Sequence, residues 1–396
     1  MYKRILIPVF IIVLMSCCTD RSDKSINREY RDYAQCLLDS VIHYYSLPES
    51  GLYREYYAFS DNHQISYLAS QDTVHKAAFL WPTSGMFSAL NMLAKATGDK
   101  VYEQLISERL LPILHQYYDT IREPNCYQSY LVSEGMSDRY YDDNIWIGID
   151  YVESYELFHK DHYLKMSESI WRFIESGRDL VLEDGIYWCE QHKSSKNTCS
   201  NAPAAVWAMK LYLATGNEDY IKAAENLYQW TVAHLQDSTD YLFFDNIKLD
   251  GTIDKNKYPY NSGQMLQAAS LLYTHTHNKR YLDDAQKIAL SCRKRFFTDK
   301  CLNDDHAIRF LKHDNIWFLA VMLRGFEEYY RVTGDSSYLS DFKNSLDYLW
   351  NHNPNSNKLF DDDCLLLKEP KSHTQWLLTQ AAMIEMYARL SIYPFL

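Results

Sequence analysis

The chain has 396 residues, of which 52 are acidic and 40 are basic, and its formal net charge is −12. Apolar residues make up 47% of the chain, which is enough for a large core and excludes a wholly disordered protein. The acidic balance argues against nucleic acid as a partner, and no glycine-rich phosphate-binding motif occurs.

Residues 1–17 are predicted to be a lipoprotein signal peptide. Lys3 and Arg4 precede an apolar run over residues 5–15, which is too short for a stable membrane-spanning helix. Leu14-Met15-Ser16-Cys17 resembles a bacterial lipobox, in which Cys17 is lipidated after cleavage. An ordinary signal peptide cut near Ser16 and an uncleaved anchor are the alternatives. We therefore expect an exported bacterial lipoprotein of the cell envelope, periplasmic or on the cell surface, that meets the membrane only through its lipid.

A polar tether is predicted over residues 18–27, and one folded domain over residues 28–396. An exported chain reaches an oxidising compartment, where disulfides form. Cys189 and Cys199 lie in one predicted connection, and a disulfide between them is one possible pairing. Beyond Cys18 the cysteines show neither a C-x-x-C pair nor zinc-finger spacing, so no metal site is expected.

Five short strings recur along the chain, and each ends at a tyrosine. The tyrosines are spaced 61, 57, 61 and 57 residues apart. Thr97-Gly98-Asp99…Tyr102 and Thr333-Gly334-Asp335…Tyr338 show the pattern, and His159 and His277 replace Gly in two other strings. Gly at this position ends a helix in the left-handed conformation, and Asp or Asn caps the next helix. The pattern predicts a tight helix–helix turn in every unit of ~60 residues.

The helices on the two sides of these turns differ in hydrophobic pattern. Segments before the turns, such as residues 145–158 and 265–273, are apolar on most sides, as buried helices are. After the turns the helices are amphipathic, and in one of them the apolar stripe consists of Tyr281, Ala285, Ile288, Ala289, Cys292 and Phe296. Each unit is therefore predicted to be a hairpin of one inner and one outer helix.

The fold class that follows is all-α, an (α/α)6 barrel, in which parallel inner helices lie inside a ring of antiparallel outer helices. An open solenoid is the alternative, but a chain that starts with an outer helix and ends with an inner one favours closure. The first outer helix is expected over residues 28–45. Inner helices are expected to begin near Pro82, Asp143, Asn201, Ser262, Asn315 and Gln375, and outer helices near Asp99, Lys160, Asn217, Asn278 and Ser336.

This topology also predicts where a ligand binds. The tight turns follow inner helices, so the long connections over residues 116–141, 177–200 and 236–259 all lead into inner-helix N-termini. Unpaired N–H groups and the helix dipole favour oxygen-rich ligands at such ends. The connections are also where functional side chains are expected.

Side chains suited to sugars recur beside these N-termini. Amides and carboxylates bind hydroxyl groups, and aromatic rings stack on sugar faces; the chain's 34 Tyr exceed the needs of a core. Taken one at a time, such residues are helix caps or core aromatics, but together they favour a carbohydrate cleft. The expected substrate-binding residues are Trp81, Tyr141, Asn144, Tyr187, Trp188, Asn201, Tyr260, Asn261, Asp314, Trp317, Gln375 and Trp376.

Asp142 and Asp143 are the candidate catalytic pair. Glycoside hydrolysis uses two carboxyl groups, one ionised and one protonated. The positive end of the helix dipole favours an ionised, nucleophilic Asp142, and the adjacent charge makes Asp143 keep its proton and act as acid and then base. Adjacent helical positions diverge by ~100°, which leaves room for the ~5–5.5 Å separation of retaining enzymes. In isolation, two such residues at a helix start are also ordinary caps.

Two other acidic runs serve as internal comparisons. Asp283-Asp284 follows a tight turn on an outer helix and is predicted to be solvated surface. The run over residues 361–363 is predicted to be a solvated loop with weak calcium-binding potential.

A family resemblance becomes specific at the acidic pair. Tyr141-Asp142-Asp143-Asn144-Ile145-Trp146-Ile147-Gly148 resembles the central motif of glycoside hydrolase family 76. Asp184-Gly185-Ile186-Tyr187-Trp188, Asn197-Thr198-Cys199-Ser200-Asn201 and Tyr260-Asn261-Ser262-Gly263 resemble its next blocks in the same order. The resemblance covers most of the chain from Trp81 onward. One departure is His313-Asp314-Asn315-Ile316-Trp317, where many members have a string like Lys-Gly-Ile-Phe, so the subsite it lines can differ.

The resemblance implies an (α/α)6 enzyme that hydrolyses the α-1,6-linked backbone of α-mannan, with endo action favoured and without metal or cofactor. It makes Asp142 the nucleophile and Asp143 the acid/base of a retaining mechanism. The partner it implies is an α-mannan polysaccharide or oligosaccharide. The alternatives are a barrel hydrolase of another glycan, an exo-α-mannosidase, transglycosylation, and a non-catalytic glycan-binding surface lipoprotein.

Overall fold

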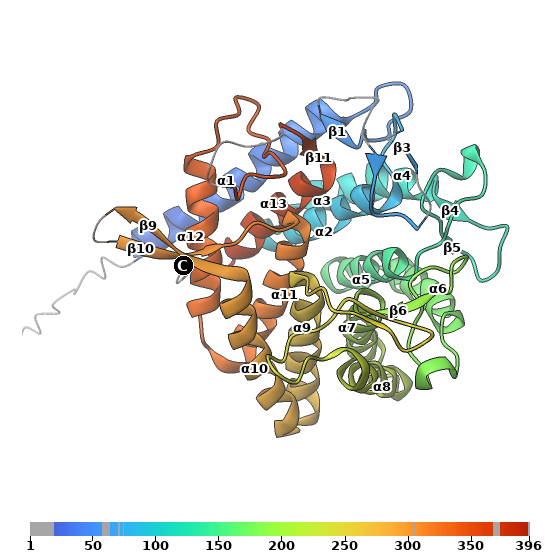
Figure 1. Cartoon of the computed structure of the whole chain (residues 1–396). Coiled ribbons are helices and arrows are strands. Elements are labelled where there is room, and N and C mark those ends of the chain that lie inside the picture. The colour runs from blue at the N-terminus through green and yellow to red at the C-terminus, as the bar shows by residue number, and fades with distance from the viewer. Residues whose placement is uncertain are drawn as a thin grey trace, which may run out of the picture.

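The computed structural model describes the chain from Asp20 to Pro394 with short gaps (Figure 1). The predicted signal peptide and Cys17 lie outside the described residues. The described residues are 20–57, 64–69, 72–73, 75–303, 306–366 and 373–394.

Six inner helices form a closed ring. Each contacts the next along the chain, and α13 returns to contact α2, which rules out the open solenoid. All six begin within three residues of the predicted positions. Their bounds are α2 (Leu80–Thr97), α5 (Tyr141–Phe158), α7 (Thr198–Thr215), α9 (Pro259–Thr276), α11 (Ile316–Thr333) and α13 (Leu377–Leu390).

The outer ring packs around this one, so the all-α (α/α)6 barrel is confirmed. The second outer helix is divided into α3 and α4 by a π-helical segment, Leu105–Leu110. After α1, every outer helix begins one residue beyond its predicted start. The outer helices are α1 (Asp20–Tyr45), α3 (Lys100–Gln104), α4 (Leu111–His115), α6 (Asp161–Ser176), α8 (Glu218–Leu235), α10 (Lys279–Phe296) and α12 (Ser337–Asn351).

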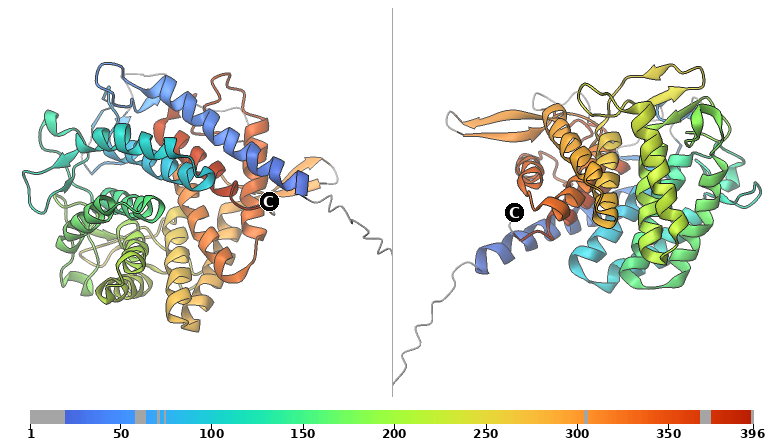
Figure 2. Two further views of the ribbon diagram at one scale, coloured as in Figure 1. Left: turned by 180° about the vertical axis from the view of Figure 1, so that it is seen from behind. Right: turned by 90° about the horizontal axis from the view of Figure 1, so that it is seen from below.

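The first outer helix is longer than predicted. It begins at Asp20, inside the segment predicted to be a tether, because no Gly or Pro interrupts the sequence from there to Tyr45. Seen from behind, α1 runs along the outside of the barrel, where it packs on α13 (Figure 2). The first and last helices of the chain thus pack together where the barrel closes. No helix among the described residues is long and apolar enough to cross a bilayer.

The tight turns have the predicted geometry. Gly98, Gly216 and Gly334 end their helices with φ of 71°, 72° and 73°. His159 and His277 take the same left-handed conformation, with φ of 53° and 54°. Asp99, Asn217 and Asn278 then accept a hydrogen bond from the backbone two residues on, at 3.0, 3.0 and 3.1 Å. Each turn therefore connects an inner to an outer helix with few residues.

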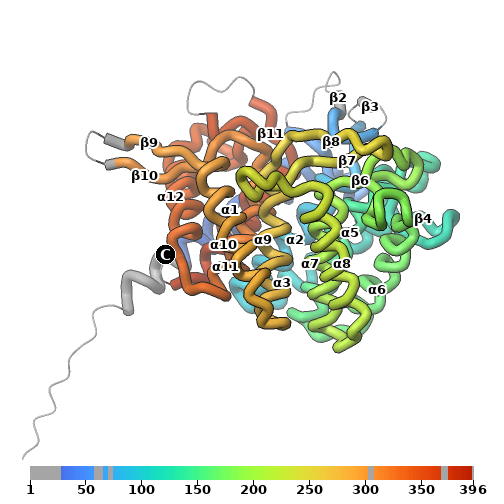
Figure 3. Tube along the Cα trace, turned by 60° about the horizontal axis from the view of Figure 1, so that its bottom comes forward, coloured from blue at the N-terminus to red at the C-terminus, as the bar shows by residue number. Residues whose placement is uncertain are grey.

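The long connections gather at the other end of the barrel and carry most of the short strands (Figure 3). Strand β1 pairs with β11 and so joins the two ends of the chain across the barrel closure. A longer hairpin, β9–β10, projects from the side near α12. The strands are β1 (Tyr56–Tyr57), β2 (Gln64–Ile65), β3 (Asp72–Thr73), β4 (Tyr118–Asp119), β5 (Cys126–Tyr127), β6 (Ser195–Asn197), β7 (Asn246–Lys248), β8 (Ile253–Asp254), β9 (Phe297–Asn303), β10 (His306–Leu311) and β11 (Gln375–Trp376).

Candidate active site

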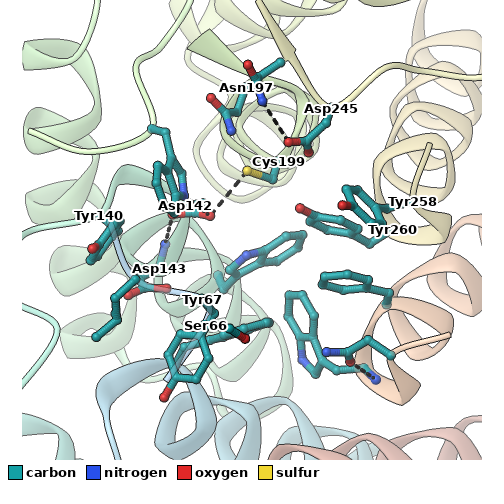
Figure 4. Close-up of a pocket in the computed structure, with 18 of the residues that line it drawn as sticks. Ser66, Tyr67, Tyr140, Asp142, Asp143, Asn197, Cys199, Asp245, Tyr258 and Tyr260 are labelled. Carbon is teal, nitrogen blue, oxygen red and sulfur yellow. Dashed lines mark hydrogen bonds between the residues drawn. The ribbon is translucent and has the colours of Figure 1, made fainter. Parts of the chain in front are cut away.

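A cavity of about 600 Å³ opens among the N-terminal ends of the inner helices. It lies at the end where the long connections gather, as the topology predicts, and holds both Asp142 and Asp143 (Figure 4). Its wall consists of Tyr56, Ser66, Tyr67, Leu68, Trp81, Tyr140, Asp142, Asp143, Trp146, Trp188, Ser194, Ser195, Asn197, Cys199, Asp245, Asn246, Lys248, Tyr258, Tyr260, Asn315, Trp317, Phe318 and Trp376.

The second residue of five inner helices lines this cavity. The helices are α2, α5, α7, α9 and α11, and all of them run parallel, so the same helical position faces the same space. This repeated geometry brings together side chains from five separate units of the sequence. The five residues are Trp81, Asp142, Cys199, Tyr260 and Trp317.

One wall is aromatic. Trp317 meets Trp81 and Trp146 edge to face, with ring centroids 5.4 and 4.9 Å apart. Phe318 stacks on Tyr260 at 4.0 Å. Tyr258 and Tyr260 lie across the cavity from the acidic pair (Figure 4). Such packed rings offer rigid apolar faces to a ligand.

Another part of the wall is polar and comes from strands β6 and β7. Asn197, Asn246 and Lys248 lie there beside Asp245. The Asp245 carboxylate accepts hydrogen bonds from Asn246 at 2.9 Å and from Asn261 at 3.4 Å. Burial raises the pKa of Asp245. The cavity thus combines apolar faces with hydroxyl-binding groups, the combination that suits a sugar.

Three donors hold the Asp142 carboxylate. Oδ2 accepts hydrogen bonds from Trp188 Nε1 at 3.1 Å and from the Cys199 thiol at 3.3 Å. Oδ1 accepts one from the backbone N–H of Asp143 at 3.1 Å. Burial raises the pKa of Asp142 to about 6, and these hydrogen bonds oppose the increase. Asp142 is therefore fixed in position and is the member of the pair that ionises first.

The Asp143 carboxyl has a different environment. Within the described part of the chain, no side chain or backbone group donates a hydrogen bond to it. Burial and then the charge of Asp142 raise the pKa of Asp143 well above its ordinary range. The pair thus consists of Asp142, which three donors hold, and Asp143, whose raised pKa favours the protonated form.

The loop that carries Trp188 is tied to the start of α5. The Tyr141 N–H donates to the Trp188 carbonyl at 2.9 Å. The guanidinium of Arg139, which is 1% exposed, donates to both carboxylate oxygens of Glu190. This ion pair, in which the guanidinium is buried and the carboxylate partly exposed, fixes the loop beside the pocket and so fixes the indole that contacts Asp142.

Five of the twelve predicted substrate-binding residues line the cavity. Three of them, Trp81, Tyr260 and Trp317, are second residues of their helices. Trp376 directly precedes α13, and its indole N–H donates to the buried Glu55 at 3.0 Å. The five residues are Trp81, Trp188, Tyr260, Trp317 and Trp376.

The other seven do not line it, and for Asn144 and Asn201 the reason is geometric. Each is the fourth residue of its helix, about 200° around the axis from the second. Asn144 Oδ1 accepts a hydrogen bond from the Tyr127 N–H at 2.8 Å, and Asn201 Oδ1 accepts one from the Ile186 N–H at 2.7 Å. Both amides therefore fasten a connection to the barrel.

The remaining five make hydrogen bonds or ring contacts with other residues of the protein. Tyr141 stacks on Phe173 of α6 at 4.5 Å, and the Tyr187 hydroxyl donates to Asp179 at 2.8 Å. Gln375 donates to Asp361 at 3.0 Å. Asn261 contacts the cavity residue Asp245, and Asp314 accepts the backbone N–H of Asn315 at 2.8 Å. These seven side chains are therefore not among those that line the cavity.

Several cavity residues were not predicted. Cys199 and Asn315 both belong to sequence motifs that resemble the family or recur beside the inner helices. The position of Cys199 as the second residue of its helix would have identified it as a cavity residue. Ser66 and Tyr67 come from a loop in the first unit, where no sequence pattern marks them. Their contribution depends on how that loop folds over the barrel end.

Two smaller predictions are corrected. Cys189 and Cys199 are both free, and Cys199 donates to Asp142 instead of forming a disulfide. The run over residues 361–363 is not solvated, since Asp361 is 4% and Asp363 8% exposed. Asp362 accepts hydrogen bonds from Trp376 N–H at 3.0 Å and Thr379 Oγ1 at 2.6 Å, so this run caps the start of α13. Among the described residues no cluster of three His, Cys, Asp or Glu is arranged to hold a metal.

Comparison with known proteins decides the family. The model of glycosyl hydrolase family 76 matches residues 40–324. The chain belongs to glycosyl hydrolase family 76. The mannosidase Bt3792 of this family, from Bacteroides thetaiotaomicron, has 31% sequence identity and a TM-score of 0.82 over 92% of this chain and 98% of that one.

More distant relatives share parts of the sequence or the fold. An inactive variant of the α-1,6-mannanase GH76A of Salegentibacter sp. HEL1_6, in complex with α-1,6-mannotriose, has 22% identity and a TM-score of 0.72, covering 92% of this chain and 99% of that one. The meiotically up-regulated gene 191 protein of Schizosaccharomyces pombe is 29% identical over 46% of this chain and 44% of its own length. The mannan endo-1,6-alpha-mannosidase DCW1 of Candida glabrata is 30% identical over 27% of this chain and 25% of its own length. The chain thus matches less than half the length of these two yeast proteins.

Proposed function

We propose that the protein is a retaining glycoside hydrolase that cleaves α-1,6-mannosidic linkages within the backbone of α-mannan. The observation that carries the proposal is the asymmetry of the acidic pair. Three donors hold Asp142, whereas no hydrogen bond from the described residues reaches the Asp143 carboxyl. Family 76 membership and the relatives that act on α-1,6-mannan support the choice of linkage.

In the first step, a carboxylate oxygen of Asp142 attacks C1 of the mannosyl unit. The bond from C1 to the glycosidic oxygen breaks, and Asp143 gives its proton to that oxygen, so the leaving chain departs as an alcohol. The product is a mannosyl ester of Asp142, and Asp143 is left as a carboxylate. Two carboxyl groups in different protonation states are what this step needs.

In the second step, water replaces the leaving chain. Asp143 takes a proton from the water, whose oxygen attacks C1 and releases the Asp142 carboxylate. Both side chains return to their starting states, and two inversions at C1 leave the anomeric configuration unchanged. We expect the carboxyl groups to be ~5–5.5 Å apart, as in other retaining enzymes.

The wall opposite the pair suits the rest of the chain of sugars. Tyr258, Tyr260 and Phe318 present rings on which the C–H faces of mannose units can stack. Asp245 and Asn246 supply acceptors and donors for hydroxyl groups. We infer that the cavity holds consecutive mannose units, which favours endo action.

The test is a time course on α-1,6-linked manno-oligosaccharides of defined length, with products sized by mass spectrometry and the new anomer followed by NMR. Mid-size fragments with the α configuration are expected early. Release of mannose alone overturns endo action, and a β product overturns the retaining mechanism. Folded wild-type protein that binds the oligosaccharides but leaves them intact overturns the hydrolase proposal in favour of a binding protein.

We propose further that the chain is exported and anchored to the cell envelope through a lipid on Cys17. The lipobox-like string and the basic, then apolar residues before it support this. The test is mass spectrometry of the mature N-terminus from membranes of the expressing bacterium. We expect a lipid-modified Cys17, lost in Cys17→Ser but kept in the matched control Cys18→Ser. An unmodified N-terminus in the wild type overturns the anchor.

A further inference from the structure

Cys199 is the one thiol that meets the acidic pair among the described residues. It is the second residue of α7, the position that Asp142 occupies in α5, so the two side chains approach each other from neighbouring helices. Its Sγ lies 3.3 Å from Oδ2 of Asp142, and the residue is 3% exposed. Figure 4 shows this contact on the cavity wall.

We propose that Cys199 is a positioning residue that fixes Oδ2 of the nucleophile Asp142 through a thiol hydrogen bond. The proposal rests on the proposed function, because Asp142 must be the nucleophile for its position to matter. Trp188 Nε1 donates to the same oxygen, so two donors from different segments define its place. The backbone N–H of Asp143 holds the other oxygen.

The weakness of the thiol as a donor suits this role. A hydrogen bond to a carboxylate stabilises its charge, and a strong donor would therefore reduce its reactivity as a nucleophile. A thiol donates weakly, so it orients the oxygen and withdraws little charge from it. Burial raises the pKa of the Cys199 thiol well above its ordinary value, so the sulfur keeps the proton that it donates.

The thiol is also protected from the chemistry that exposed cysteines undergo. Reactive thiols are accessible and have lowered pKa values, whereas Cys199 is buried and its pKa is raised. The titratable groups that interact with Asp142 or Cys199 include Asp143 on α5, Tyr260 on α9, Asp245 before β7, and Cys189 in the loop of Trp188. The basic side chain of Lys248, on β7, lines the same cavity. The neutral thiol gives Asp142 a donor without placing a further positive charge beside it.

The test uses three substitutions of Cys199 in the whole protein and one matched control. Cys199→Ala and Cys199→Val both remove the donor, one leaving a void and one filling it, whereas Cys199→Ser keeps a donor. Cys292→Ala is the control, since Cys292 is also fully buried with a raised pKa but lies on the outer helix α10. The pH dependence of kcat/KM is measured for each variant.

Loss of the donor raises the pKa of Asp142, so the acid limb of the profile should move to higher pH. We expect an upward move of about half a unit to one unit in both Cys199→Ala and Cys199→Val. At the wild-type optimum, kcat/KM should fall about 3- to 10-fold. Cys199→Ser replaces the thiol by a stronger donor, so its acid limb should not move to higher pH, although its kcat should fall because a stronger hydrogen bond lowers the reactivity of the carboxylate. Cys292→Ala should match the wild type. If Cys199→Ala and Cys199→Val differ from each other and neither shifts the acid limb, Cys199 only fills space and the proposal is wrong.

Infrared spectroscopy gives a readout without substrate. The S–H stretching band of Cys199, obtained as the difference between wild type and Cys199→Ala, should lie at lower frequency than the Cys292 band obtained in the same way. Bands at equal frequency overturn the hydrogen bond. Wild-type protein that cleaves no mannan overturns the proposed function and this role with it. Active protein with an unmoved acid limb overturns only the role of Cys199.

Discussion

The two ends of the barrel carry the same dipeptide, Asp-Asp, in opposite settings. Asp142-Asp143 begins an inner helix and lines the cavity among the long connections. Asp283-Asp284 lies in the second turn of the outer helix α10, near the tight-turn end, where Asp283 is exposed and Asp284 accepts a hydrogen bond from Tyr228 at 3.1 Å. The comparison teaches that the place of a dipeptide in the barrel decides whether its carboxyl groups face the cavity or the outer surface.

The sharpest test of this comparison substitutes one residue in each pair. Asp142→Asn and Asp143→Asn should each lower kcat on α-1,6-manno-oligosaccharides about 10²- to 10⁴-fold, because in the proposed mechanism Asp142 forms the bond to C1 and Asp143 transfers the proton. Asp283→Asn should leave kcat unchanged, since it alters a solvated side chain. Steady-state kinetics with a check of folding measures both. Equal losses in all three variants would break the comparison.

A second prediction concerns how the connections at the cavity end are held. Lys196, which is fully buried, donates to the Asp179 carboxylate at 2.9 Å and to the carbonyls of Val181 and Asp184 at 2.7 and 2.6 Å. Lys196→Met removes the donor to the two carbonyls and the cation beside Asp179, whose carboxylate keeps only the hydrogen bonds from Tyr187 and the Val181 N–H, so it should lower the free energy of unfolding by about 2–4 kcal/mol. Chemical denaturation measures the change.

The matched control for that variant is Lys193→Met. Lys193 is exposed and lies over the same Tyr187 ring as Lys196, at 5.3 Å against 4.7 Å. Its loss should change the stability by no more than about 0.5 kcal/mol. Equal effects of the two substitutions would mean that contact with the ring, and not the buried oxygens, holds the loop.

A third prediction concerns how the stability of the protein depends on pH, through a buried carboxyl group at the cavity end of the barrel. Burial raises the pKa of Asp362 to about 7, while hydrogen bonds from Thr379 and from the Trp376 N–H oppose the increase. A carboxyl with a raised folded-state pKa adds stability that is complete below its unfolded-state pKa and is lost as pH rises through 7. Asp362→Asn mimics the protonated form, so it should match wild type at low pH and be more stable by about 2 kcal/mol above pH 8.

Calorimetry across this pH range measures the difference in melting temperature. Asp283→Asn is the control, because its exposed side chain should give no pH-dependent difference. An Asp362→Asn variant that is destabilised equally at every pH would show that the carboxylate, and not the neutral carboxyl, caps α13.

The sequence predicts the barrel well because local chemistry repeats. Left-handed residues such as Gly98 and His277, each followed by an Asp or Asn cap, mark most of the turns without any knowledge of tertiary contacts. The start of α1 was missed because its first polar turns carry no capping or amphipathic signal. Helix bounds therefore follow from the sequence wherever a cap marks them.

The site is only partly predictable, for a geometric reason. Asp142 and Asn144 are both polar and two residues apart, yet one faces the cavity and the other clamps Tyr127. Residue type alone does not distinguish the two positions, whereas the helical phase, once the start of α5 is known, does. Neither residue type nor helical phase predicts Tyr67, because a long connection brings it to the cavity.

The smallest expected effect is on stability at the tight-turn end of the barrel. There the backbone conformation of a residue, and not the chemistry of its side chain, determines how well it fits. His277 holds φ at 54°, a conformation that costs a residue with a Cβ more than it costs Gly. His277→Gly should therefore raise the stability by about 0.5 kcal/mol, after the greater freedom of Gly in the unfolded chain is subtracted. Gly216→Ala makes the reverse change at φ 72°, where a Cβ would meet no atom within 4 Å, so any loss of stability there comes from the backbone alone. Thermal unfolding should show the two variants moving in opposite directions while kcat stays constant in both, because neither position reaches the cavity. A change in kcat in either one would mean that the two ends of the barrel are coupled.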